Sequence, residues 1–298
     1  MKNIVLLLLS LPIILGFGGL VKYNLQLNAY IEQETTQHTA NSSISNDHKA
    51  EVHIIGTVHF ETDSIKRYHL YNYLDSIAPS IILYEGDSSS VRKIVNKTDY
   101  FDQIINTLKN RKKLEKPVAL KYTEHHPECV LLPYEWEKRV KYHRKHRFTK
   151  RSNEMLNLVI GLYRDSLLTR PQTAIIEEFL ELNRITSKID NGQITNINNT
   201  ITDSLIKRRQ QDYIYTAIPE IAKDRKELVA YLDFIPIHMN YWDTRNKVMA
   251  QNILKQIEHH PNKTIVVLTG FSHRYYLIEE LLPYQTEYGF VLNPVDRK

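Results

Sequence analysis

The chain has 298 residues, of which 42% are hydrophobic and 24% charged, a composition that is ordinary for a globular protein and does not favour intrinsic disorder. The length suits one large domain or two small ones. A formal net charge of +5 is too small to predict a nucleic-acid-binding protein. Cys129 is the only cysteine, which excludes an internal disulfide and a cysteine-rich zinc site.

Residues 1–25 have the pattern of a targeting segment. A basic start at Lys2 is followed by an uncharged apolar stretch, 4–21, and then by Lys22. This pattern is typical of a secretory signal peptide or of an uncleaved N-terminal membrane anchor, and both alternatives stay open. We therefore expect the protein in the cell envelope, either membrane-anchored or secreted (periplasmic or extracytoplasmic).

Residues 26–50 lack apolar periodicity and are rich in Thr, Ser, Asn and Gln, so we expect a polar linker there. From residue 51 onward, strand-like runs alternate with helical patterns. The expected strands lie at 51–57, 80–86, 129–136, 265–268 and 289–292, and the expected helices at 63–77, through most of 152–235, at 237–258 and at 274–282. The pattern predicts an α/β domain at 51–298, with a mixed central β-sheet flanked by helices and a helical insertion at about 140–235.

Polar side chains stand where three of these expected strands end. Gly56 and His59 form a Gly-x-x-His pattern after the first strand, and Gly270 and His273 form a second one near the end of the chain. Glu85 ends the second strand. Functional groups of α/β sheets gather beyond the carboxyl ends of the strands. We expect each glycine to adopt torsions that other residues avoid, so that the chain turns sharply there.

Two imidazoles and one carboxylate, from His59, His273 and Glu85, are a sensible ligand set for a divalent metal such as zinc, manganese or cobalt. Three protein ligands leave a position for water, which the metal acidifies toward neutral pH. Without a metal, the same side chains could act as general base, general acid and orienting group around a water molecule.

The expected helix at 237–258 carries two polar residues on or beside its apolar stripe. Asn246 falls within the stripe and Arg245 borders it. Buried amides and guanidinium groups are costly unless they are paired. Arg245 could stabilise developing negative charge on a substrate, with help from Asn246, or could form a structural salt bridge with Glu85. The apolar positions of the stripe are Trp242, Met249, Ile253 and Ile257.

Residues 138–151 contain eight Lys or Arg residues and no acidic residue. One interpretation is contact with an anionic surface, such as lipid headgroups, lipopolysaccharide or nucleic acid. The other, which we prefer on sequence alone, is a solvated helical face or a lid over the site.

Four blocks of the chain, IIGTVH, ILYEG, RNKVMAQNI and VVLTGFSHRYYLIEELL, occur in this order and resemble the TraB/Tiki superfamily. This superfamily includes the TraB, PrgY and GumN proteins, the erythromycin esterases and the haem-binding ChaN proteins. Its hallmarks are paired Gly-x-x-His motifs, a glutamate after the second strand, and an Arg-Asn helix before the second histidine. They map onto Gly56/His59, Glu85, Arg245/Asn246 and Gly270/His273.

The resemblance implies a metal-dependent hydrolase that cleaves a peptide or ester bond with a metal-activated water. His59, Glu85 and His273 would hold the metal, and Glu85, Arg245 and Asn246 would be catalytic. The first histidine continues as HFETD and the second as HRYYL, which departs from many relatives at the rim of the site. The substrate class therefore does not carry over.

Two alternatives from other functional classes stay open: a non-catalytic haem- or metal-binding protein, and a regulator that binds a peptide signal. As partners we expect a peptide or small ester substrate and the membrane, through the N-terminal segment, but not nucleic acid. No Gly-x-Ser-x-Gly, P-loop or His-Glu-x-x-His pattern is present, so serine hydrolases, NTPases and zincins have no support.

Overall fold

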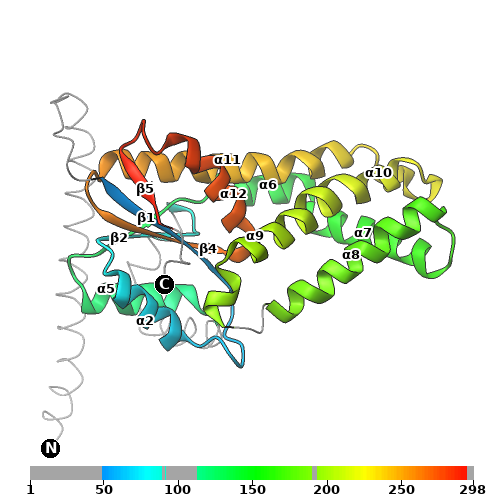
Figure 1. The fold of residues 1–298 in the computed structure, drawn as a ribbon. Coiled ribbons are helices and arrows are strands. Elements are labelled where there is room, and N and C mark those ends of the chain that lie inside the picture. The colour runs from blue at the N-terminus through cyan, green and yellow to red at the C-terminus, as the bar shows by residue number, and fades with distance from the viewer. Residues whose placement is uncertain (1–48, 89–90, 92–112, 190–192, 294–298) are drawn as a thin grey trace, which may run out of the picture. The chain divides into compact units, whose positions relative to one another are not determined.

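The computed structural model describes residues 49–88, 91, 113–189 and 193–293 (Figure 1). A five-stranded sheet forms its centre, in the order β3-β2-β4-β1-β5. The strands are β1 (Ala50–Thr57), β2 (Ile81–Tyr84), β3 (Val130–Pro133), β4 (Thr264–Gly270) and β5 (Phe290–Leu292). The predicted α/β fold is confirmed. All four pairings between these strands are parallel, so the prediction of a mixed sheet is wrong in that detail.

The predicted targeting segment at 1–25 and the predicted linker up to residue 48 lie outside the described residues. Within the part of the chain that the structure describes, no helix has the length and apolar character needed to cross a membrane.

The central strands are buried on both faces, as parallel strands covered by helices usually are. Residues 265–270 of β4 and 81–83 of β2 are all buried. The helices α2 (Arg67–Ile77) and α5 (Glu115–His125) cover one face of the sheet, and α11 (Ile235–His259) and α12 (Phe271–Leu281) cover the other (Figure 1). The short helix η5 (Leu282–Tyr284) follows α12 and leads into β5.

The predicted insertion is a bundle of helices between β3 and the start of α11 (Figure 1). It has its own apolar core, to which Val159, Ile176 and Leu228 contribute fully buried side chains. Its helices are α6 (Arg139–His146), α7 (Phe148–Arg164), α8 (Arg170–Ile189), η2 (Ile194–Ile197), α9 (Thr200–Lys207), the π-helical η3 (Arg208–Ala217), α10 (Ile218–Lys223) and η4 (Lys226–Tyr231).

One buried amide ties this insertion to the end of β1. β5 pairs with β1 only from Ala50 to Val52, so Gly56 has no strand partner on that side. The side chain of Asn198 replaces it. Its Oδ1 accepts from the Gly56 amide at 2.6 Å, and its Nδ2 donates to the Gly56 carbonyl at 2.9 Å. Because buried backbone groups need partners, Asn198 stabilises the segment that leads to His59.

Candidate functional site

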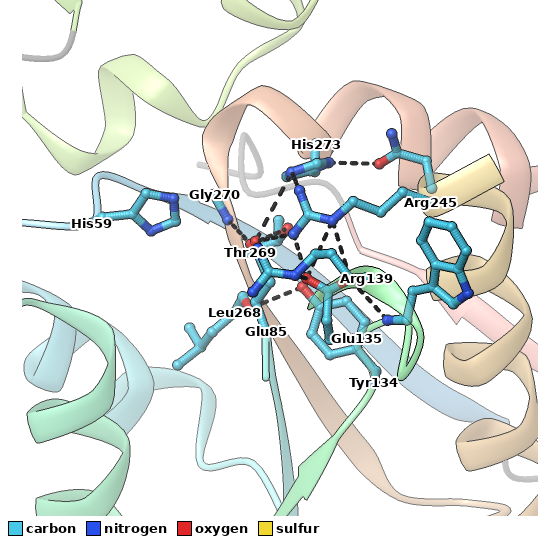
Figure 2. Close-up of polar contacts among 12 residues, drawn as sticks. His59, Glu85, Tyr134, Glu135, Arg139, Arg245, Leu268, Thr269, Gly270 and His273 are labelled. Carbon is cyan, nitrogen blue, oxygen red and sulfur yellow. Dashed lines mark hydrogen bonds and ion pairs between the residues drawn. The ribbon is translucent and has the colours of Figure 1, made fainter. Parts of the chain in front are cut away.

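Polar residues that follow four adjacent strands meet at one edge of the sheet (Figure 2). The register of the sheet explains why. Tyr84 pairs with Leu268, so Glu85 comes to lie beside Thr269 and Gly270. The carboxyl ends of parallel strands share an edge, which brings residues distant in the chain into one site. His59, Glu85 and His273, predicted as a group, all lie around this edge.

His59 lies in the loop after β1 and is held by a carboxylate. Its Nδ1 is 3.0 Å from Oε1 of Glu115, the first residue of α5. The hydroxyl of Thr57 donates to the same oxygen at 2.6 Å. The hydrogen bond that Nδ1 donates to Glu115 is the main reason why the pKa of His59 is raised from its ordinary value, against the opposing effect of burial. The His59 side chain is 61% exposed, so the ring is oriented by the protein and open to solvent.

The ring of His59 lies directly over Gly270. A Cβ atom at Gly270 would be 3.1 Å from Cε1 and 3.2 Å from Nε2 of His59. Neither motif glycine has a positive φ, so the expectation of special torsions is wrong. Both positions require glycine because no space is left for a side chain. A Cβ atom at Gly56 would be only 3.0 Å from the Cα of Phe271. Each glycine therefore allows a close approach of another part of the chain.

Glu85 is locked between the sheet edge and Arg245. Its Oε2 accepts from the backbone amide of Gly270 at 2.6 Å, and its Oε1 accepts from Nη2 of Arg245 at 2.6 Å. Burial alone would raise the pKa of Glu85. At the low pH where Glu85 titrates, His273, Arg245 and His59 are all positively charged. These charges, together with the Gly270 amide, outweigh burial and lower the pKa to about 2. Glu85 is therefore an anion at neutral pH.

Arg245 is the centre of the network and has more than one carboxylate partner. The Nε atom lies 3.1 and 3.2 Å from the two oxygens of Glu135, and Nη2 also donates to Glu135. Arg139 lies 3.1 Å from Glu135 on its other side. Two guanidinium groups thus balance two buried carboxylates. The salt bridge to Glu85 that the sequence left open is present, and Glu135 adds a second one.

His273 lies on the first turn of α12 as a buried, neutral ring. Nδ2 of Asn246 donates to the carbonyl of Trp242, so Oδ1 of Asn246 faces the ring and accepts from Nδ1 of His273 at 2.7 Å. The other nitrogen, Nε2, accepts from Nη1 of Arg245 at 2.6 Å. Burial is the main reason why the pKa of His273 falls to about 3, and Arg245 lowers it further. Trp242 stacks on the ring with centroids 4.3 Å apart.

The predicted metal ligands have unequal freedom in this arrangement. His59 keeps Nε2 available, whereas both ring nitrogens of His273 are engaged. A metal ion on His273 would have to displace the guanidinium of Arg245 and would lie beside its positive charge, so His273 as placed does not fit a metal. Among the described residues, no group of three or more His, Cys, Asp or Glu side chains is arranged to hold one. The divalent metal stays a prediction.

Arg245 and Asn246 are both buried and paired, as their place on the stripe predicts. In the structure Asn246 orients His273, and Arg245 holds both Glu85 and His273. The catalytic role of Arg245 and Asn246 stays a prediction. Sequence reasoning missed Glu115 and Glu135. Glu135 follows β3 as Glu85 follows β2, so the strand-end rule could have found it. No local pattern marks Glu115 as the partner of His59.

No protein-family model, curated protein or solved structure shows significant similarity to this chain. The resemblance to the TraB/Tiki superfamily therefore depends on the four sequence blocks alone.

Proposed function

We propose that this protein is an exported or membrane-anchored hydrolase of the TraB/Tiki type that cleaves a peptide or ester bond with an activated water. The observation that carries the proposal is the pair His59–Glu115. A solvent-exposed imidazole is held by a buried carboxylate, at the sheet edge where the two Gly-x-x-His motifs meet.

In this proposal His59 is the general base. The hydrogen bond that Nδ1 donates to Glu115 orients the ring and favours the tautomer with a free lone pair on Nε2. That nitrogen takes a proton from a water molecule as the water oxygen attacks the carbonyl carbon of the substrate. The imidazolium then returns the proton to the leaving alcohol or amine, so the cycle ends with neutral His59.

The buried network of Glu85 and Arg245 fixes the part of the site against which the His59 ring lies. Glu85 accepts from Gly270, the residue over which the His59 ring lies, and Arg245 fixes Glu85 in turn. The negative charge of Glu85 also raises the pKa of His59, although less than Glu115 does. A ring that is hydrogen-bonded to Glu115 and lies against Gly270 is pre-organised for proton transfer.

A bound divalent metal would supply a more acidic water. In the observed geometry His59 offers one free ligand atom and His273 offers none, so the proposal requires no step on a metal. Metal content is measured as part of the test below.

Arg245 is fully paired with Glu85 and Glu135 inside the protein, and this favours a second candidate function. A network with all its buried charges balanced is also typical of a rigid scaffold. The second candidate function is therefore a non-catalytic protein that binds a peptide signal or a cofactor at the exposed His59.

The test is hydrolysis by the purified full-length chain, assayed against a peptide library and a panel of fluorogenic esters. His59→Ala should lower kcat/KM by about 10²–10⁴-fold in a protein that is still folded at the assay temperature. His259→Ala, which removes an exposed histidine at the end of α11, is the matched control and should retain activity. Elemental analysis of the wild type, His59→Ala and His273→Ala proteins reports any bound metal.

Equal activity in the wild type and His59→Ala would contradict the proposal. Absence of turnover on all substrates, with a bound peptide or cofactor that is lost in His59→Ala, would favour the second candidate. A metal lost from both histidine variants would mean that Arg245 moves away from His273 when the metal binds.

A further inference from the structure

The helix α6, in the basic stretch noted above, presents two different faces. Its inner face contains aromatic contacts: Tyr142 stacks on Tyr241 with centroids 5.6 Å apart, and His143 stacks on Phe148 at 5.0 Å. Its outer face is cationic. We call the exposed side chains of Lys138, Lys141, Arg144, Lys145 and Arg147 the basic face.

No described residue neutralises the basic face. The basic residues that turn inward are paired, since Arg139 contacts Glu135 and Arg151 contacts Asp233. The five side chains of the basic face form no ion pair with any residue that the structure describes, and the sequence contains no acid between Glu137 and Glu154. Like charges three and four residues apart destabilise a helix. Such a face suits a partner that supplies negative charge.

An exposed aliphatic side chain among these charges favours lipid over nucleic acid. Val140 lies on α6 among the cations and is 49% exposed. Cations mixed with exposed aliphatic groups match the boundary between headgroups and acyl chains of a bilayer.

We propose that the basic face docks onto the surface of an anionic phospholipid bilayer, with lipid phosphates as counter-ions for Lys138, Lys141, Arg144, Lys145 and Arg147. Because Arg139 of the same helix pairs with Glu135, docking would hold the candidate site close to the bilayer surface.

The test places a reporter on this face without removing a charge. Val140→Cys in the full-length chain carries an environment-sensitive fluorophore, because the only native cysteine, Cys129, is buried. The protein is mixed with vesicles of phosphatidylcholine alone, or of phosphatidylcholine with phosphatidylglycerol, each containing a lipid-attached quencher. Leu180→Cys, a comparably exposed position on α8, is the matched control. The N-terminal segment is present in every sample, so its contribution is the same in all the variants that are compared.

We expect quenching at position 140 only with the anionic vesicles, and its loss as the Debye length shrinks from ~10 Å at 0.1 M salt to ~3 Å at 1 M. Lys138→Gln, Lys141→Gln and Lys145→Gln together should lower the docking constant about 100-fold, roughly five-fold for each cation. The control Lys188→Gln, Lys247→Gln and Lys255→Gln should leave it unchanged. Equal quenching in both lipids, or a fluorescence response to a short DNA duplex but not to anionic vesicles, would overturn the proposal.

Discussion

Nδ1 of His59 and Oε1 of Glu115 lie 3.0 Å apart although 56 residues separate them in the chain. One residue follows the first strand and the other opens the helix before the third strand. Their contact joins an exposed ring to a buried carboxylate that Thr57 also fixes. This pair therefore sets both the orientation and the basicity of His59.

Glu115→Gln should shift the pH dependence of activity toward lower pH. Glu115 is the main cause of the raised pKa of His59, and a general base works only when neutral. Activity should therefore rise with pH through the raised pKa in the wild type and at a lower pH in the variant. Titration of the His59 ring by NMR measures the same shift directly. A variant with an unchanged midpoint would show that Glu115 does not control His59.

Arg245→Met should destabilise the folded protein by about 3–5 kcal/mol, because it leaves Glu85 and Glu135 as buried carboxylates without their shared partner. Urea unfolding measures the loss. Adding Glu135→Gln to Arg245→Met should recover part of it, since one uncompensated charge is then removed. Arg184→Met, which breaks a surface pair with Glu181, is the control and should change stability little. Equal effects at both arginines would contradict the buried ion network.

Local patterns predict most of the elements of the fold. The apolar run between Pro79 and Gly86 indicates β2, and the apolar stripe of 237–258 indicates α11. The stripe also predicts that Arg245 and Asn246 are buried and paired. The strand order and the fully parallel pairing do not follow from such patterns, because pairing joins residues as distant as Thr57 and Gly270.

The partners in the site were harder to predict than the elements. The strand-end rule brings His59, Glu85 and His273 together, but it leaves open which atom each side chain presents. Arg245 takes the lone pair of His273 that a metal would need, and this depends on how α11 packs against α12. Glu115 reaches His59 through the packing of α5, which no spacing in the sequence encodes.

His273 should make the protein less stable in acid. Its pKa is about 3 in the folded protein and ordinary when unfolded, so between pH 6.5 and 3 the unfolded chain binds more protons. The free energy of unfolding therefore falls as pH falls through this window, by up to ~1.4 kcal/mol per pH unit for one proton. Glu85, whose pKa is also lowered in the folded protein, makes the protein less stable in acid too, but only at pH values below the ordinary pKa of a glutamate.

Measurements between pH 4.5 and 6.5 separate the two groups. His273→Gln should flatten the slope of stability against pH in this window, whatever its effect on stability at neutral pH. His238 is also buried, with a pKa lowered by burial to about 4, so His238→Gln should flatten the slope in the same way. An unchanged slope in His273→Gln would mean that the ring is already protonated in the folded protein.

Gly270→Ala should impair activity more than stability. The backbone of Gly270 has φ −56°, which alanine adopts without strain, but the new Cβ atom would lie 3.1 Å from the His59 ring. The ring must shift by a few tenths of an ångström, and the rate of proton transfer is sensitive to the placement of a catalytic group, so kcat/KM should fall several-fold. Since the ring is solvent-exposed, it can shift at little cost to folding. Gly161→Ala on α7, where nothing lies within 4 Å of the added atom, should instead stabilise the protein by about 0.5–1 kcal/mol and leave activity unchanged. Paired measurements of kcat/KM and urea unfolding on the two variants separate the two effects, and full activity in Gly270→Ala would show that the His59 ring does not act from its place over Gly270.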